Sequence, residues 1–457
     1  MPQLKDIQSI YFIGIGGIGM SALARYFKSR GARVSGYDKT RTPLTIQLES
    51  EGISLHYDDD IKWVDKEADL VVYTPAIPKD HAGLNYCLSH HAKVVKRSDM
   101  LSYVTAGTYS ICVAGTHGKT TTSSMVAHLL RDSDFGCSAF LGGITANYGT
   151  NFWSDTSNVT VAEADEYDRS FLKLHPDVAV LTAMDADHLD IYGTESAMQE
   201  AFVEFTHKIK KGGLLVLHEG LPREQDMNGS LKISYSLSSM KADAYAVNLR
   251  IENGACRFDV QLKNKKLSDF SLFMGGRHNV ENAIAAIIVA DHLKISEDKM
   301  RAALASFKGV HRRFEYVLHQ QDSILIDDYA HHPEELKALI SGVKEMFPEK
   351  KCAIVFQPHL YSRTKDFAQG FSEALSLADE VFLLPIYPAR ELPIEGVSSQ
   401  MIADGMKTKS ARLFEKEAFL EHVRSARLSL LVVAGAGDID MMVEPLKKIM
   451  EGKLNKI

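Results

Sequence analysis

The sequence predicts an α/β fold built from several doubly wound units. Short apolar runs recur along the chain, and helix-like segments separate them. These runs are continuous rather than alternating, which is typical of parallel strands that helices cover on both faces. Strand-then-glycine turns near Gly14, Gly115 and Gly435 fit three such units. The runs lie at residues 9–17, 68–77, 110–115, 159–166, 177–184, 351–359, 380–387 and 428–438.

Length and composition restrict the class of protein. The 457 residues correspond to about three domains of roughly 150 residues each. The formal net charge of −7, from 52 basic and 59 acidic residues, argues against a surface that coats nucleic acid. The five cysteines include no C-x-x-C pair, and the chain shows neither a signal peptide nor a run of about 18 apolar residues. We therefore expect a soluble cytoplasmic protein with no membrane insertion and no nucleic-acid partner.

Changes of pattern along the chain predict where its domains begin and end. Strand patterns restart after helical segments near the two predicted boundaries. Between residues 235 and 274, polar and apolar positions alternate, and the Asn253-Gly254 pair is typical of a tight hairpin turn. We expect this stretch to form antiparallel hairpins within the middle domain. The predicted domains are 1–106, 107–312 and 313–457.

The first glycine turn has the pattern of a diphosphate-binding site. Gly14, Gly16 and Gly19 follow an apolar run and precede a helical segment, and Asp38 ends the next apolar run. Such glycines let backbone amides approach a pyrophosphate at a helix N-terminus, and the acidic residue takes a ribose hydroxyl. The pattern leaves open NAD, FAD or a UDP-sugar as the ligand, and also a tight turn without a ligand.

The second glycine turn resembles a phosphate-binding loop that is two residues short. The usual spacing would place its first glycine at Val113, but the nearest glycine is Gly115. The chemistry survives the shortening, because Lys119 can reach the β- and γ-phosphates and the Thr120 hydroxyl can hold Mg²⁺. The loop predicts binding of ATP or GTP. Its residues are Gly115, Thr116, His117, Gly118, Lys119, Thr120 and Thr121.

Further polar clusters could complete a nucleotide site. Two acidic segments end predicted strands, where each could be a solvated loop or, beside a phosphate loop, a source of metal ligands. The first segment holds Glu163, Asp165, Glu166 and Asp168, and the second holds Asp185, Asp187, His188 and Asp190. Asn279 and Asn282 lie near the start of a helical segment, where they could cap the helix or pair with a base edge. The residues alone favour capping.

Eight motifs follow one another across nearly the whole chain. They are GTHGKTT at 115–121, EADE at 163–166, DHLDIYG at 187–193, GRHNVENAIAA at 276–286, GVHRRFE at 309–315, DDYAHHPEE at 327–335, FQPHLYSRT at 356–364 and GAGDI at 435–439. Together these motifs resemble the Mur ligases of peptidoglycan synthesis. In that family the shortened loop is the ordinary ATP site.

The resemblance implies a three-domain architecture and an activity. It implies a Rossmann-like N-terminal domain for a UDP-sugar, a central P-loop-type ATPase domain and a Rossmann-like C-terminal domain for an amino acid. The implied reaction is ATP-dependent ligation of L-alanine to the carboxylate of UDP-N-acetylmuramate through an acyl phosphate, with release of ADP and phosphate. ATP and two Mg²⁺ ions are the implied cofactors, and the C-terminal domain is expected to close over the nucleotide.

The resemblance also assigns roles to residues of this chain. Lys119 would neutralise the ATP phosphates, Thr120 and Glu163 would hold one Mg²⁺, and His188 would hold a second. His331, His359 and Arg363 would surround the incoming amino acid and the transferred phosphate. Other implied nucleotide contacts are Gly115, Thr116, His117, Gly118, Thr121, Asn279, Asn282, Arg313 and Asp328. Implied substrate contacts are Gly14, Gly16, Gly17, Gly19, Thr74, Ser98, Glu166 and Tyr329, and Asp38 becomes a weaker candidate for the ribose.

Departures from the family pattern leave alternatives open. Leu360 stands where the family commonly has an arginine, which bears on recognition of the amino-acid carboxylate, and Arg363 or Arg390 could compensate. Ala183 and Asp185 stand where the family often has asparagine and glutamate. One alternative is a ligase that attaches a recycled tripeptide to UDP-N-acetylmuramate. Others are a nucleotide-dependent oxidoreductase and a nucleotide-gated binding module.

Overall fold

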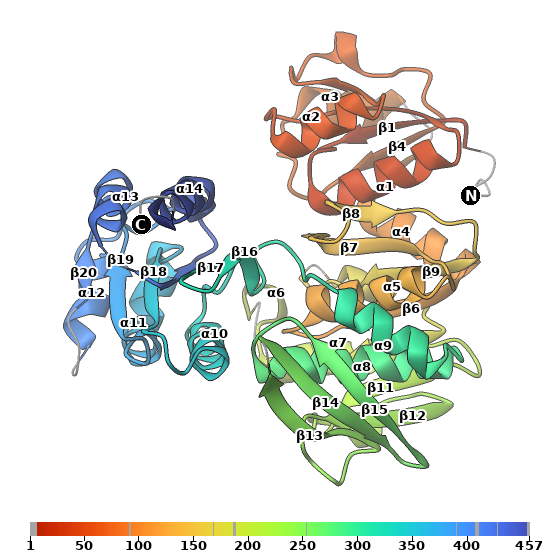
Figure 1. Ribbon diagram of the computed structural model, residues 1–457. Coiled ribbons are helices and arrows are strands. Elements are labelled where there is room, and N and C mark those ends of the chain that lie inside the picture. The colour runs from red at the N-terminus through yellow and green to blue at the C-terminus, as the bar shows by residue number, and fades with distance from the viewer. Residues whose placement is uncertain are drawn as a thin grey trace. The chain divides into compact units, whose positions relative to one another are not determined.

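The computed structural model describes residues 7–90, 93–167, 169–185, 189–252, 254–389, 391–406, 411–426 and 428–454. The chain folds into two compact units, and its described residues form three sheets flanked by helices (Figure 1). The predicted α/β class is therefore confirmed. Within the described residues, no helix is both long enough and apolar enough to cross a membrane. The two units are residues 1–248 with 258–270 and 281–307, and residues 249–257 with 271–280 and 308–457.

The first sheet is parallel throughout and has the strand order β3-β2-β1-β4-β5. Alternate side chains of β1 (Ser9–Ile13) serve two cores: Phe12 packs with α1 (Ile18–Ser29) and α4 (Arg97–Gly107), whereas Tyr11 packs with α3 (Ala82–His90). Figure 1 shows α1 and α3 on opposite sides of β1. The other elements are β2 (Arg33–Tyr37), α2 (Pro43–Ser50), β3 (Ser54–His56), β4 (Leu70–Tyr73) and β5 (Val94–Lys96).

The second sheet has the order β15-β14-β13-β12-β11-β10-β6-β9-β7-β8. Strands β13 to β7 in this order run parallel, and β8 pairs antiparallel with β7. The strands from β6 to β12 are β6 (Tyr109–Ala114), β7 (Ser138–Thr145), β8 (Thr150–Trp153), β9 (Val159–Glu163), β10 (Val178–Leu181), β11 (Leu214–His218) and β12 (Leu231–Ser236). The helices are α5 (Lys119–Asp132), α6 (Leu189–Tyr192), α7 (Glu195–Thr206), α8 (Arg277–His292) and α9 (Glu297–Ser306).

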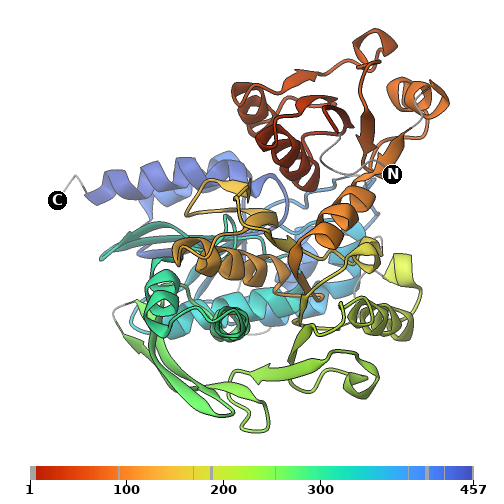
Figure 2. The same ribbon diagram turned by 90° about the vertical axis from the view of Figure 1, so that its right-hand side faces the viewer.

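Three long strands, β13 (Ala244–Glu252), β14 (Ala255–Leu262) and β15 (Lys265–Leu272), form one end of this sheet (Figures 1 and 2). Two-residue connections join them, and so short a connection can link only antiparallel neighbours. The hairpins predicted between residues 235 and 274 are thus confirmed. Gly254 has φ +74°, as a tight turn requires, while Asn253 lies outside the described residues.

The third sheet has the order β16-β17-β21-β18-β19-β20, and only its edge strand β16 runs antiparallel to its neighbour. Its core is apolar and continuous along β18 and β21, as the predicted buried runs require. The strands are β16 (Glu315–Gln320), β17 (Ser323–Asp328), β18 (Ala353–Phe356), β19 (Glu380–Leu383), β20 (Arg412–Leu413) and β21 (Leu430–Ala434). The helices are α10 (Pro333–Met346), α11 (Tyr361–Leu375), α12 (Ser399–Gly405), α13 (Lys416–Ser425) and α14 (Val443–Leu454).

A buried polar cluster ties α1 to the β7–β8 hairpin within the first unit. Arg25 of α1 pairs with Glu51 at 2.8 Å and donates a hydrogen bond to Oδ1 of Asn151 at 3.0 Å. Asn151 is fully buried in β8, and its amide donates to the carbonyl of Ile18 at 2.7 Å. Because Ile18 begins α1, this cluster anchors the glycine turn that directly precedes the helix.

Replacing Asn151 by alanine should destabilise the first unit, because the substitution removes a partner from buried Arg25 and from the carbonyl of Ile18. We expect a loss of about 2 to 3 kcal/mol in the free energy of unfolding, seen as a lower midpoint of thermal unfolding in calorimetry. Ser154→Ala, at an exposed position just after β8, serves as the control. Equal midpoints for Asn151→Ala and the wild type would contradict this account.

Candidate active site

The shortened loop connects β6 to α5, as the motif predicts. Gly115 has φ +137° and Gly118 has φ +80°, and both values favour glycine. A Cβ atom at Gly115 would collide with the hydroxyl of Thr182, and one at Gly118 would lie 2.8 Å from Oδ1 of Asn282. Space and backbone conformation therefore both require these glycines. They let the chain enter α5 with its first amide groups directed at the loop.

The start of α5 has the character of an anion site. Gly118 is the N-cap, it makes no side-chain capping bond, and the first turn contains no acidic residue. The amide groups of the first turn have no partner inside the helix, and the helix dipole favours a negative group there. Thr120 is half-buried and Thr121 is buried in this turn. This arrangement suits a phosphate group.

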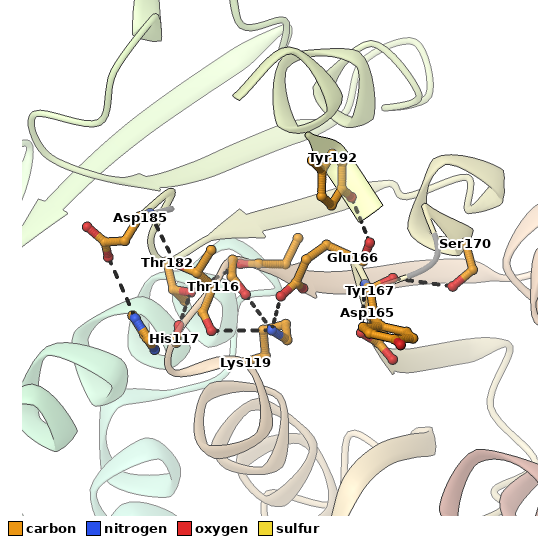
Figure 3. A network of polar contacts seen from close by, with 12 residues as sticks. Thr116, His117, Lys119, Asp165, Glu166, Tyr167, Ser170, Thr182, Asp185 and Tyr192 are labelled. Carbon is orange, nitrogen blue, oxygen red and sulfur yellow. Dashed lines mark hydrogen bonds and ion pairs between the residues drawn. The ribbon is translucent and has the colours of Figure 1, made fainter. Parts of the chain in front are cut away.

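Lys119 makes an ion pair that the sequence motifs did not reveal. Its Nζ lies 2.8 Å from Oε1 of Glu166 and 2.6 Å from the carbonyl oxygen of Gly115 (Figure 3). The carboxylate of Glu166 is fully buried, and the hydroxyl of Tyr192 donates to its backbone carbonyl at 2.6 Å. Burial raises the pKa of Glu166, whereas Lys119 lowers it. Glu166 thus touches the lysine of the phosphate loop.

Glu163, at the end of β9, lies beside the same loop. Its Oε2 accepts a hydrogen bond from the amide of Gly142 at 3.0 Å, and the side chain of Thr120 also bonds to it. Burial raises the pKa of Glu163, and Lys119 and Thr120 oppose that rise. The structure therefore brings together Thr120 and Glu163, the two described residues predicted to share a metal ion.

A small cavity opens next to Glu163. Arg97 and Ser98, from the start of α4, line it together with Glu163 and Asp165. Ser98 is buried and accepts a hydrogen bond from Lys173 at 3.1 Å. The predicted substrate contact Ser98 and the predicted metal ligand Glu163 thus share one cavity.

The remaining loop residues are tied to the segment after β10. The hydroxyl of Thr116 accepts a hydrogen bond from the amide of Asp185 at 3.2 Å, and the ring of His117 lies 4.0 Å from the carboxylate of Asp185 (Figure 3). Thr182 donates to the backbone carbonyl of His117. His188, predicted to hold a second metal ion, lies outside the described residues. Within those residues, no group of three or more His, Cys, Asp or Glu side chains forms a metal cluster.

The two asparagines at the start of α8 are both buried. The side chain of Asn282 lies against Gly118 at the start of α5, which brings it to the phosphate loop within the first unit. In the second unit, the amide of Asn279 donates to the carbonyl of Gly275 at 2.7 Å, a bond to the backbone just before the helix. Their predicted contact with adenine stays a prediction.

The first glycine turn has the expected geometry, and Asp38 braces it, while the ribose contact of Asp38 stays a prediction. Oδ2 of Asp38 accepts a hydrogen bond from the amide of Gly16 at 2.7 Å, so the carboxylate braces the turn itself. A Cβ atom at Gly14 would lie 2.6 Å from Thr74, and one at Gly19 would collide with Arg97. Gly17 is the N-cap of α1, whose first turn contains no acidic residue. The amides after Gly17 form a second anion site.

In the second unit, the candidate side chains follow the carboxyl ends of parallel strands. His331 follows β17 and His359 follows β18, and their ring centroids lie 6.3 Å apart. Burial, followed by the charge of Arg363 and by His331, lowers the pKa of His359 to about 4. Burial and Arg363 also lower the pKa of His331, and Glu335 opposes this. Both imidazoles are therefore neutral at pH 7.

The sequence did not point to Tyr387, which follows β19. Its ring stacks on the ring of His359 with centroids 5.7 Å apart and an angle of 21°. The amide of Leu360 donates to the carbonyl of Tyr387 at 2.9 Å, and the amide of Tyr387 donates to Pro358 at 2.9 Å. Leu360 has φ +70°, and its side chain is half-buried. Arg390 lies outside the described residues, and its compensating role stays a prediction.

Arg313, Asp328 and Tyr329 form a second group in this unit. The guanidinium of Arg313 lies 5.3 Å from the ring centroid of Tyr329, a cation–π arrangement. Asp328 accepts hydrogen bonds from the amides of Phe314 and Ala330, each at 2.7 Å. Burial raises the pKa of Asp328 to about 6, although Arg313 and the two amides oppose the rise. The structure therefore gathers the three residues predicted from two separate motifs.

Comparisons with known proteins match this arrangement over most of the chain. Family models described as "Mur ligase family, catalytic domain", "Mur ligase middle domain" and "Mur ligase, glutamate ligase domain" match residues 9–109, 113–290 and 312–440. The chain belongs to the Mur ligase family. The predicted three-domain architecture of this family is confirmed, while the domain boundaries predicted at 106/107 and 312/313 stay predictions.

Several Mur ligases are similar to the chain over its whole length. A UDP-N-acetylmuramate–L-alanine ligase of Flavobacterium johnsoniae is 46% identical over 453 residues, which cover 98% of this chain and 99% of that protein. The enzyme of the same name from Cytophaga hutchinsonii is 45% identical and covers 99% of each chain. Among solved structures, the UDP-N-acetylmuramate-alanine ligase of Thermotoga maritima has a TM-score of 0.81 at 29% identity, covering 98% of this chain and 100% of its own. A murein peptide ligase of Psychrobacter arcticus, at 22% identity and a TM-score of 0.67 over 98% and 99% of the chains, shares the fold.

The lowered pKa of His359 predicts a loss of stability in mild acid. Between the folded value of about 4 and the ordinary value of 6.5, the unfolded chain binds more protons than the folded one. The stability that neutral His359 provides is thus present above pH 6.5 and is lost as the pH falls toward 4. His359→Gln should therefore show a smaller drop in the midpoint of thermal unfolding from pH 7 to pH 5 than the wild type. His90→Gln, at an exposed histidine, is the control, and an undiminished drop in His359→Gln would refute the assignment.

Proposed function

We propose that this protein joins L-alanine to the carboxylate of UDP-N-acetylmuramate in the bacterial cytoplasm, with hydrolysis of ATP to ADP and phosphate. The observation that carries the proposal is the loop of residues 115–121, in which Lys119 lies beside Glu163 and Glu166 at the start of α5. The likeness to enzymes named UDP-N-acetylmuramate–L-alanine ligase over almost the full chain supports the substrates.

The first unit would hold ATP and activate the muramoyl carboxylate. The amides of the loop and Lys119 bind the phosphates, and the charge of Lys119 offsets the repulsion between the carboxylate and the γ-phosphate. The carboxylate attacks the γ-phosphorus, ADP leaves, and an acyl phosphate forms. The neutral amine of L-alanine then attacks the acyl carbon of this mixed anhydride. Phosphate leaves with the electrons of the broken C–O bond, and the nitrogen loses a proton to give the amide.

Glu163 and Thr120 fit a magnesium ion. A half-buried carboxylate whose pKa is raised by burial gains from a cation, and a carboxylate with a hydroxyl is the hard oxygen set that Mg²⁺ prefers. When bound, the metal neutralises charge that develops on the transferred phosphoryl group. A second ion is assigned to His188.

The diphosphate of UDP-N-acetylmuramate is assigned to the turn at Gly14–Gly19, near Thr74. The anion site at the start of α1 supports this assignment. Arg97 lies against Gly19 of that turn and also lines the small cavity beside Glu163, and this position supports a muramoyl group that extends from the turn toward the phosphate loop. In the second unit, Arg363 pairs with the carboxylate of L-alanine or the phosphate, because its guanidinium binds two oxygens at once. His331 and His359 surround the amine.

The substrates can be tested by phosphate release. We expect release from ATP with Mg²⁺ and UDP-N-acetylmuramate to depend on L-alanine, with the mass of the product showing the new amide. The tripeptide L-alanyl-γ-D-glutamyl-meso-diaminopimelate should not replace L-alanine; stimulation by the tripeptide alone would assign the protein to the recycling ligases.

Lys119→Ala should lower turnover at least about 100-fold, because it removes a charge that stabilises the transition state. Lys241→Ala, at an exposed lysine, is the matched control.

The assignment of Glu163 can be tested through its neighbour Gly142. A Cβ atom at Gly142 would collide with the carboxylate of Glu163, so Gly142→Ala should displace that carboxylate without changing its chemistry. We expect turnover to fall about 10- to 100-fold and the Mg²⁺ concentration for half-maximal phosphate release to rise. The control is Gly107→Ala, where a Cβ meets open space. A variant with normal Mg²⁺ dependence would remove Glu163 from the metal site.

A further inference from the structure

The ammonium group of Lys119 is bonded to other groups of the protein. Its ammonium group donates to Glu166 at 2.8 Å and to the carbonyl of Gly115 at 2.6 Å, and the carbonyl of Thr116 lies at 3.5 Å (Figure 3). An ammonium group has three donors, so short bonds to the protein use two of them. A phosphate that binds the loop must compete for this group.

Contacts with Tyr192 fix the backbone of Glu166. The hydroxyl of Tyr192 donates to its backbone carbonyl at 2.6 Å, and the guanidinium of Arg169 lies 4.9 Å from the ring centroid of Tyr192. The side chain of Glu166 has no exposed surface, whereas 14% of the side chain of Lys119 is exposed. Lys119 is therefore the partner that can move toward a phosphate, and Glu166 is the partner that stays.

We propose that Glu166 is a positioning residue that holds the ammonium group of Lys119 against the loop. When a nucleotide binds, its phosphate oxygens take the place of Glu166 as the partner of Lys119, and this exchange of partners sets the affinity for the nucleotide. The inference rests on the ATP site of the proposed function. A buried carboxylate that loses its ammonium partner is costly, and that cost opposes nucleotide binding. The same cost favours release of ADP, because the ion pair forms again when the nucleotide leaves.

A substitution that keeps the shape of Glu166 and removes its charge should therefore strengthen nucleotide binding. In Glu166→Gln, no buried charge is left behind when Lys119 moves to a phosphate. We expect Mg-ADP to bind the full-length protein about tenfold more tightly, equivalent to about 1.4 kcal/mol, as measured by calorimetry. Tighter binding separates this role from a structural one, since a damaged fold would weaken binding. The kcat for phosphate release should fall while the KM for ATP also falls.

Two further variants make the test specific. Glu166→Asp keeps the charge and should bind Mg-ADP within about threefold of the wild type. Glu195→Gln removes an exposed charge at the start of α7, where the carboxylate accepts a hydrogen bond from Gln199 at 3.0 Å. It should change the affinity less than about threefold. Glu166→Gln with equal or weaker affinity, or Glu195→Gln with the same gain, would overturn the exchange. A wild type that fails to bind Mg-ADP would overturn the ATP site itself.

Discussion

The parallel order of the strands is the constraint on which the candidate site depends. Parallel strands bring their carboxyl ends to the same edge of a sheet, so the loops that follow them meet there. In the second sheet, this edge unites the loop after β6, Glu163 at the end of β9 and Thr182 after β10. In the third sheet, it unites His331 after β17 and His359 after β18. Residues from distant motifs become neighbours because their strands are neighbours.

The phosphate loop balances charges within a small buried volume. Lys119 faces Glu166 and lowers the pKa of both Glu163 and Glu166, while burial raises the pKa of both carboxyl groups. Lys119 thus acts on two carboxyl groups at once, and a metal ion would add further positive charge to this site. The helix N-terminus at Gly118 supplies only partial positive charge. Added cations and phosphate anions therefore bind such a site together more readily than either binds alone.

Local sequence patterns predicted many residues of this site, but they could not predict which residues far apart in the sequence would pair. The phosphate-loop motif predicts Gly115 and Gly118 at the strand-to-helix turn, and both glycines have positive φ there. The pairing of Lys119 with Glu166 joins residues 47 positions apart and depends on how two strands are ordered, which no motif states. Asp38 fits a ribose contact by position, and that contact stays a prediction. The bond from the amide of Gly16 to the Asp38 carboxylate depends on the exact path of the turn, which no motif states.

In the second unit, the charge of one arginine favours the neutral form of two histidines. Arg363 lowers the pKa of both His331 and His359, so its positive charge stands beside two neutral imidazoles. An α-amino acid brings a carboxylate and an ammonium group, and a protonated imidazole would repel the ammonium group. A neutral imidazole instead offers a lone pair that can accept a hydrogen bond from it. The stacking of Tyr387 on His359 adds a face that excludes water and so keeps the ring neutral. Under the proposed function, Arg363 thus serves both ends of the amino acid: its charge attracts the carboxylate, and its effect on the two histidines keeps them neutral for the ammonium group.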